Sequence, residues 1–136
     1  DPRFFGPPSE VTETAWQTLF PKGRGFVRLY DHDPDGEDFS VSGFHQIHCL
    51  YTIRHFFSVA LSHDESIDDE TVDHVYHCID YLRQALICSA DPTLDRATPV
   101  PGHPHIVSAL GWGTTHSCRD YGSLFAWAEG HRRSNS

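Results

Sequence analysis

The sequence of 136 residues has few basic side chains and no long apolar run. Lys and Arg total 10 against 19 Asp and Glu, giving a formal net charge of −9 with neutral His. The basic residues are scattered, whereas nucleic-acid-binding proteins present clustered positive charge to phosphates. We therefore expect no nucleic-acid partner. No apolar segment approaches the roughly 20 residues that a membrane-spanning helix needs.

The chain also begins without Met and without a signal-peptide pattern. We therefore expect the natural N-terminus to lie upstream. The length suits one domain, and a hydrophobic content of 38% with 10 Gly and 9 Pro is typical of a loop-rich globular chain. The distribution of Pro and Gly predicts an N-terminal arm at residues 1–25, a single metal-binding catalytic domain at 26–130 and a tail at 131–136.

No CxxC pair is present, although the chain contains four cysteines, Cys49, Cys78, Cys88 and Cys118. An even number without CxxC favours two disulfides over a zinc–thiolate site, and disulfides indicate an oxidising compartment. Four cysteines allow three pairings, and the sequence does not distinguish them. Buried free thiols are the alternative.

Two apolar stripes predict two long helices. The first stripe is Ile47, Leu50, Ile53, Phe57 and Leu61, and it indicates a helix over residues 44–61. A polar loop at 62–69 precedes a second helix that ends near residue 89, before an Asp-Pro pair. Short helices are expected near residues 9–20 and 119–129, with irregular chain at 91–118. The predicted fold class is mainly α, with two central helices, long irregular loops and short terminal helices.

Each long helix carries the same motif: His45-Gln46-Ile47-His48-Cys49 and His74-Val75-Tyr76-His77-Cys78. Residues three apart on a helix lie about 5–6 Å from each other, so one metal ion bonded at about 2 Å can bridge each histidine pair. Both pairs point away from the apolar stripes. We expect His45, His48, His74 and His77 to meet at one metal site, the alternative being hydrogen-bonded interior histidines.

Convergence of the four imidazoles sets a geometric condition. A tight turn at residues 62–69 would leave His48 and His74 several helical turns apart, because each helical residue rises 1.5 Å. Either the loop folds back by about 12 Å, which eight extended residues can cover, or the helices cross steeply.

The two HxxHC motifs and the segments that follow them resemble a fungal family, the UstYa-like proteins of mycotoxin gene clusters. The resemblance covers residues 43–129, and its motifs lie at residues 45–50, 74–94, 111–113 and 116–121. It implies a lumenal catalytic domain of the secretory pathway, anchored in the full-length protein by a membrane helix that this sequence does not contain. It also implies copper and a functional role for both HxxHC motifs, including Cys49 and Cys78.

The ligand chemistry agrees with copper as cofactor. Neutral imidazole suits copper, zinc, iron and nickel, while the absence of an evident carboxylate ligand disfavours a two-His-one-carboxylate iron site. His116 is a further candidate ligand in a glycine-rich turn, His103 and His105 are weaker ones, and a second copper is conceivable. Tyr81, Asp80 and Asp120 are candidates for orienting the ligands, or else for packing, capping and ion pairing.

The predicted function is a copper-dependent oxidase in fungal natural-product biosynthesis. The resemblance implies a peptide or related small metabolite as substrate and cyclisation, dehydrogenation, hydroxylation or halogenation as the reaction. A homo- or heterodimer is conceivable. Three alternatives stay open: a zinc-bound structural module, a noncatalytic partner subunit, and a metal-free cyclase or isomerase with a His base.

Overall fold

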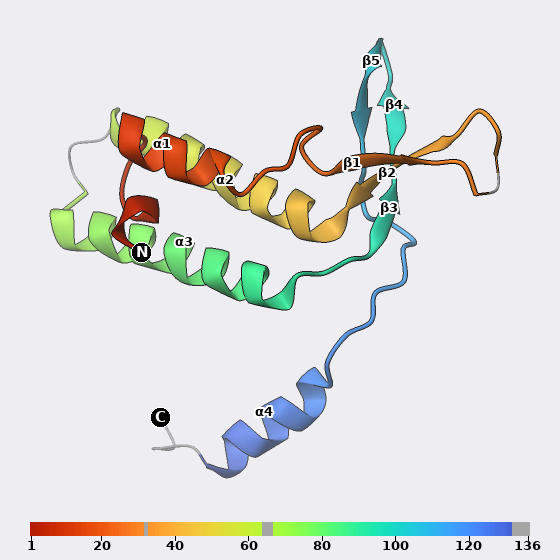
Figure 1. Cartoon of the computed structure of the whole chain (residues 1–136). Helices are drawn as coiled ribbons and strands as arrows, with labels where there is room; N and C mark the ends of the chain where they lie inside the picture. Colours follow the sequence, from red (N-terminus) through yellow and green to blue (C-terminus); the bar gives the residue numbers. More distant parts are fainter. Residues whose placement is uncertain (32, 64–66, 132–136) are drawn as a thin grey trace.

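The computed structural model describes residues 1–31, 33–63 and 67–131, and in them helices and strands are mixed (Figure 1). Helices make up 48% and strands 17% of the residues that the structure describes. The elements in chain order are a short 3₁₀ helix η1 (Pro2–Phe4), α1 (Glu10–Gln17), β1 (Phe26–Leu29), β2 (Glu37–Val41), α2 (Ser42–Leu61), α3 (Asp69–Ser89), β3 (Leu94–Arg96), β4 (Thr98–Val100), β5 (His103–Ser108) and α4 (Tyr121–Gly130).

The prediction of a mainly α fold with long irregular loops was therefore wrong. Two small antiparallel sheets are present, one in the order β1-β2-β3 and one formed by β4 and β5, and the strands β3, β4 and β5 lie in residues 91–118, which were expected to be irregular. The strand β2 pairs with β3 across more than fifty residues of sequence, with Phe39 opposite Arg96 and Val41 opposite Leu94. Strands of three to six residues show too little periodicity to be recognised, because their stability comes from such distant partners.

The helices α2 and α3, which the two apolar stripes predicted, form an antiparallel hairpin. Its buried core consists of Trp16, Ile47, Leu50, Tyr76 and Ile79. The register is set at one end by the hydroxyls of Ser58 and Tyr76, which lie 2.7 Å apart. At the other end the backbone N–H of Gly43 donates to the carbonyl of Asp91 at 2.9 Å. Ile53, predicted to be in the core, is instead 59% exposed.

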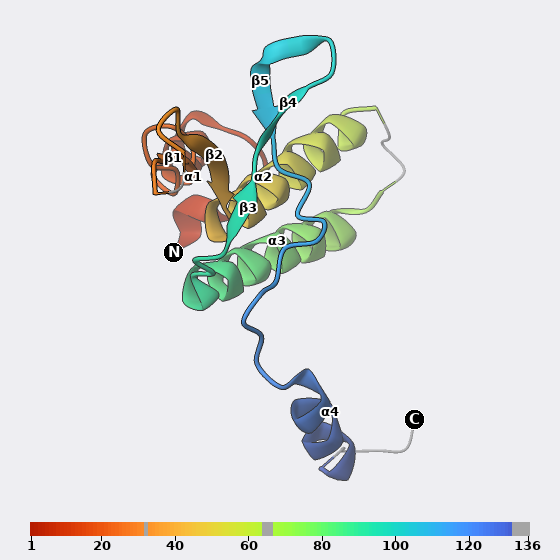
Figure 2. The same ribbon diagram turned by 90° about the vertical axis from the view of Figure 1, so that its right-hand side faces the viewer.

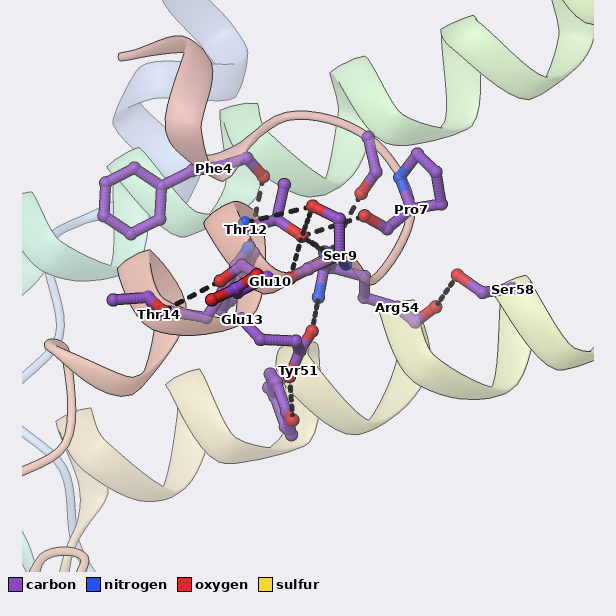
Figure 3. A network of polar contacts seen from close by, with 12 residues as sticks. Phe4, Pro7, Ser9, Glu10, Thr12, Glu13, Thr14, Tyr51, Arg54 and Ser58 are labelled. Carbon is purple, nitrogen blue, oxygen red and sulfur yellow. Dashed lines mark hydrogen bonds and ion pairs between the residues drawn. The ribbon is translucent and has the colours of Figure 1, made fainter.

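The helix α1 packs on this hairpin through a buried arginine (Figure 3). Arg54 is fully buried and donates to the carbonyl of Gly6 at 3.1 Å, to Oγ1 of Thr12 at 2.7 Å and to Oε1 of Glu13 at 2.7 Å. Tyr51 donates its hydroxyl to the second oxygen of Glu13 at 2.5 Å. Burial raises the pKa of Glu13, but hydrogen bonds from Tyr51 and Arg54 outweigh it and lower the pKa overall.

The three-stranded sheet holds the chain after α3 against the start of α2. The Ser42 backbone N–H donates to the carbonyl of Thr93 at 2.8 Å, and its hydroxyl donates to Oδ2 of Asp95 at 2.7 Å. Gly25 lies so close to the first turn of α2 that a Cβ there would be 2.5 Å from Cβ of Phe44, and its φ of +85° also favours glycine. These contacts position one end of the hairpin beside residues 91–95.

The helix α4 stands apart from the hairpin, beyond α3 in both views (Figures 1 and 2). Residues 109–120 tether it. Asp120 caps it by accepting from the backbone N–H of Ser123 at 2.9 Å. Among the residues described, no helix combines the length and the apolar character needed to cross a bilayer.

Candidate metal centre and adjoining cleft

Both HxxHC motifs lie on helices, and each places its two imidazoles side by side. The ring centroids of His45 and His48 are 6.3 Å apart, and those of His74 and His77 are 6.2 Å apart. His45 is half-buried, whereas the other three rings are exposed. The i, i+3 spacing on the two long helices accounts for this pairing.

The two pairs do not meet within one chain. Because Ser58 faces Tyr76 and the helices are antiparallel, His48, ten residues before Ser58, is level with residue 86 of α3. That position is nine residues beyond His77, or about 14 Å along the axis. Among the residues that the structure describes, no group of three His, Cys, Asp or Glu side chains is placed to hold an ion. The geometric condition for a four-histidine site is therefore not met in this arrangement.

His45 instead shares a cleft with His116. The cleft has a volume of about 350 Å³ and lies between α2 and α3 at the end of the hairpin that the sheet adjoins. Its lining residues are Ser42, His45, Gln46, Cys49, Leu50, Ile53, Leu82, Leu86, Asp95 and His116. The lining combines aliphatic side chains with a few polar ones, which is typical of a site for a small ligand or a side chain. His74 lines a different pocket with residues of the first turn of α3.

Asp91 orients His116, a role that the sequence analysis did not recognise. Its Oδ2 lies 3.0 Å from Nδ1 of His116 and accepts from the Gln46 amide at 3.2 Å. Hydrogen bonds from the side chain and backbone of Thr93 lower the pKa of Asp91 to about 2, with His116 adding to the effect. An ionised Asp91 accepts a hydrogen bond from Nδ1–H of the neutral ring and leaves the Nε2 lone pair free, as in histidines that bind metals. In the sequence Asp91 stood out only as a helix terminator.

The other proposed orienting residues have local partners. Asp80 accepts from Arg83 at 2.8 Å and from Gln84 at 2.9 Å. Asp120 caps α4. These are the ion pair and the cap that the sequence allowed as alternatives. Tyr81 is exposed, with its ring centroid 6.2 Å from that of His77. His103 and His105 lie on β5 with exposed side chains.

Asp95 adds an unusual carboxylate to the cleft. It is buried beside the first turn of α2, where the helix dipole favours negative charge. One of its oxygens accepts from Ser42. The other, Oδ1, is the one buried side-chain nitrogen or oxygen that lacks a hydrogen-bond partner in the part of the chain described.

The predicted disulfides are not formed in the structure. Cys49, Cys78, Cys88 and Cys118 are all free and all exposed, so the alternative of buried thiols fails as well. Cys78 and Cys88 are ten residues apart on one helix, or about 15 Å, well beyond the Cα separation of roughly 4.4–6.8 Å in a disulfide. Cys49 and Cys78 lie on the same exposed faces as the histidines that precede them.

Comparison with known proteins gives a consistent assignment. The family model described as mycotoxin biosynthesis protein UstYa matches residues 1–131. The UstYa family oxidase phomYb of Diaporthe leptostromiformis is 41% identical over 93% of this chain and 53% of its own length. The oxidase ustYa of Aspergillus flavus is 37% identical over 88% of this chain and 59% of its own length.

A more distant relative is the hydroxylase cctR of Talaromyces islandicus, 35% identical over 65% of this chain and 31% of its own length. The chain thus spans little more than half the length of the two oxidases that it matches. No solved structure matches.

Proposed function

The chain belongs to the UstYa family of mycotoxin biosynthesis proteins, and on that premise we propose that it is a copper-dependent oxidase that modifies a peptide or a related secondary metabolite. Its relatives are named as oxidases, a hydroxylase and a chlorinase. These names share an oxidation of the substrate and differ in the group introduced. Oxidative tailoring in fungal secondary metabolism is therefore the activity that the relatives share and that we assign to this chain.

Copper fits the histidine pair of each HxxHC motif separately, rather than all four histidines together. Each HxxHC motif offers two adjacent imidazoles, and nitrogen ligands of this kind suit copper. His45 and His48 would hold an ion on α2, beside the cleft that His45 shares with His116, and His74 and His77 would hold one on α3. When bound, copper supplies one-electron redox chemistry with dioxygen.

The residues of the chain support this function in defined ways. Asp91 holds His116 by Nδ1, so that its Nε2 remains available as a ligand. Leu50, Leu82 and Leu86 provide an apolar surface in the cleft that can receive an apolar portion of a substrate. The shared cleft of His45 and His116 is the single structural observation on which the location of the site depends.

Metal analysis of the purified chain tests the proposal. We expect stoichiometric copper by mass spectrometry and a Cu(II) EPR spectrum with nitrogen hyperfine splitting. His48→Ala should lose the ion of the α2 pair and His77→Ala that of the α3 pair, while circular dichroism retains the helical signal, because both rings are exposed. His63→Ala, an exposed histidine outside both motifs, is the matched control.

The alternatives give different results in the same assay. Tightly held zinc with unfolding on chelation would indicate a structural module. Full copper loading in both histidine variants would remove those residues as ligands. An inactive chain that gains activity only when mixed with a second family member would indicate a partner subunit, and activity that survives chelators would indicate metal-free chemistry with a His base.

The location proposed for the full-length protein is the lumenal side of the secretory pathway, with a membrane anchor outside this sequence. This follows from the family resemblance. Protease protection of a tagged full-length protein in fungal microsomes would test it: digestion of the domain without detergent would contradict a lumenal position.

A further inference from the structure

Two helices of this acidic chain carry almost no charge. The 20 residues of α2 include no Asp, Glu or Lys, and their one arginine, Arg54, is completely buried. Residues 121–128 of α4 include no charged side chain at all. By contrast α3 begins with Asp69 and Glu70. In a chain of net charge −9, the outer faces of α2 and α4 are therefore exceptional helical surfaces.

The outer face of α2 has the spacing of a packing seam. Cys49, Thr52, Phe56 and Val59 follow one another at intervals of three, four and three residues, on the side opposite the buried core. This is the spacing at which one helix packs along another. Ile53 borders the row and is 59% exposed, and Phe56 is 65% exposed. We call the residues Thr52, Ile53, Phe56 and Val59 the α2 seam.

The helix α4 presents the matching surface. Its four large apolar side chains, Tyr121, Leu124, Phe125 and Trp127, are 57–75% exposed. An isolated helix of ten residues is marginally stable in water, so a helix of this composition requires a packing partner. Within its own chain α3 lies between α4 and α2 (Figures 1 and 2).

We propose that the chain forms a homodimer in which α4 of each copy packs on the α2 seam of the other. A twofold arrangement creates both contacts at once, since each copy offers one α4 and one seam. From the exposed areas of the side chains, the two contacts together would bury on the order of 1,500 Å², the size of a standard stable interface.

The dimensions are compatible with this exchange. The length of α4 is about 15 Å, and the seam from Thr52 to Val59 extends about 10 Å along α2. The partner helix therefore covers the apolar part of α2 and leaves His45 and His48, on the first two turns, outside the contact. The inference does not depend on metal binding.

Light scattering coupled to gel filtration, with a thiol reductant to keep the exposed cysteines reduced, tests the proposal. The unmodified chain should have twice the 15.4 kDa mass of the single chain. Phe56→Ser on the seam and the double variant Leu124→Ser/Phe125→Ser on α4 should each be monomeric at concentrations where the parent is dimeric. Val11→Ser, an equally exposed apolar residue on α1, should remain dimeric.

Mixing the two variants distinguishes a dimer with reciprocal α4–seam contacts from other dimers. A mixture of Phe56→Ser chains with Leu124→Ser/Phe125→Ser chains retains one intact α4–seam contact, so a weaker heterodimer should form although neither variant dimerises alone. A monomeric parent, including one whose α4 docks on its own chain, overturns the proposal. A dimer that dissociates only in the seam variant also overturns the proposal, since the seam would then contact a surface other than α4. Failure of the two variants to form a heterodimer overturns it as well.

Discussion

Replacement of Arg54 by Ala removes the one charged group that the structure buries completely in α2. Three acceptors lose their donor at once: the Gly6 carbonyl, Oγ1 of Thr12 and Oε1 of Glu13. Thr12 Oγ1 keeps the backbone N–H of Ser9 as a donor at 2.9 Å, but the Gly6 carbonyl lies in buried surroundings, where an unsatisfied polar group costs about 1–3 kcal/mol. Glu13 is a third exposed and regains water. Together with the cavity left by a fully buried side chain, we expect a loss of about 3–5 kcal/mol in the free energy of unfolding.

This loss is large compared with the total. A domain of 136 residues has a stability of about 7–20 kcal/mol at 0.05–0.15 kcal/mol per residue. With a urea m-value of about 1.5 kcal/mol/M, the midpoint should fall by on the order of 2 M or more. Urea titration followed by circular dichroism and by the fluorescence of the buried Trp16 measures it.

A matched arginine provides the control. Arg28 binds both oxygens of Asp38 at 2.7 and 2.9 Å, but the pair is exposed. Solvent screens such pairs, so Arg28→Ala should hardly move the urea midpoint. Equal shifts for the two variants would refute the reasoning that burial, rather than hydrogen-bond geometry, makes the Arg54 network important.

The loss of stability in Arg54→Ala should also depend on pH. The pKa of Glu13 is lower in the folded chain than its ordinary 4.5, so its stabilising contribution is present above pH 4.5 and is lost as pH falls through the folded pKa. Because Arg54 helps to lower that pKa, Arg54→Ala should lose part of this acid dependence. The difference between parent and variant should therefore narrow below pH 4.5, and a gap that widens there would contradict the assignment.

Two further predictions concern aspartates. Asp91→Asn should weaken copper binding about 10–100-fold in a chelator competition, because it releases His116, whereas Asp80→Asn should leave the copper affinity unchanged. The pKa of Asp91 is about 2, so the contribution of Asp91 to the free energy of unfolding should be constant above pH 3.8 and decline below it. Removal of the helix caps should show that α4 unfolds independently of the hairpin. Asp68→Ala at the start of α3 should lower the midpoint of global unfolding, whereas Asp120→Ala should reduce only the amide-exchange protection of α4.

The sequence alone determined the features that depend on neighbours along the chain. The apolar stripes predicted α2 and α3 to within a few residues of their ends, because amphipathic periodicity is local. The spacing of each HxxHC motif determined that its two imidazoles would lie side by side. The motifs were also sufficient for the family resemblance that the family model confirms.

Tertiary structure decided everything that depends on how distant segments meet. The hairpin register set by Ser58 and Tyr76 separates the histidine pairs, since one helical residue of offset moves a ligand by 1.5 Å. The pairing of β2 with β3 brings Asp95 to Ser42, and the chain after α3 brings Asp91 to His116, across 25 residues. Such contacts are absent from local periodicity, because each is stabilised only when both segments have already folded.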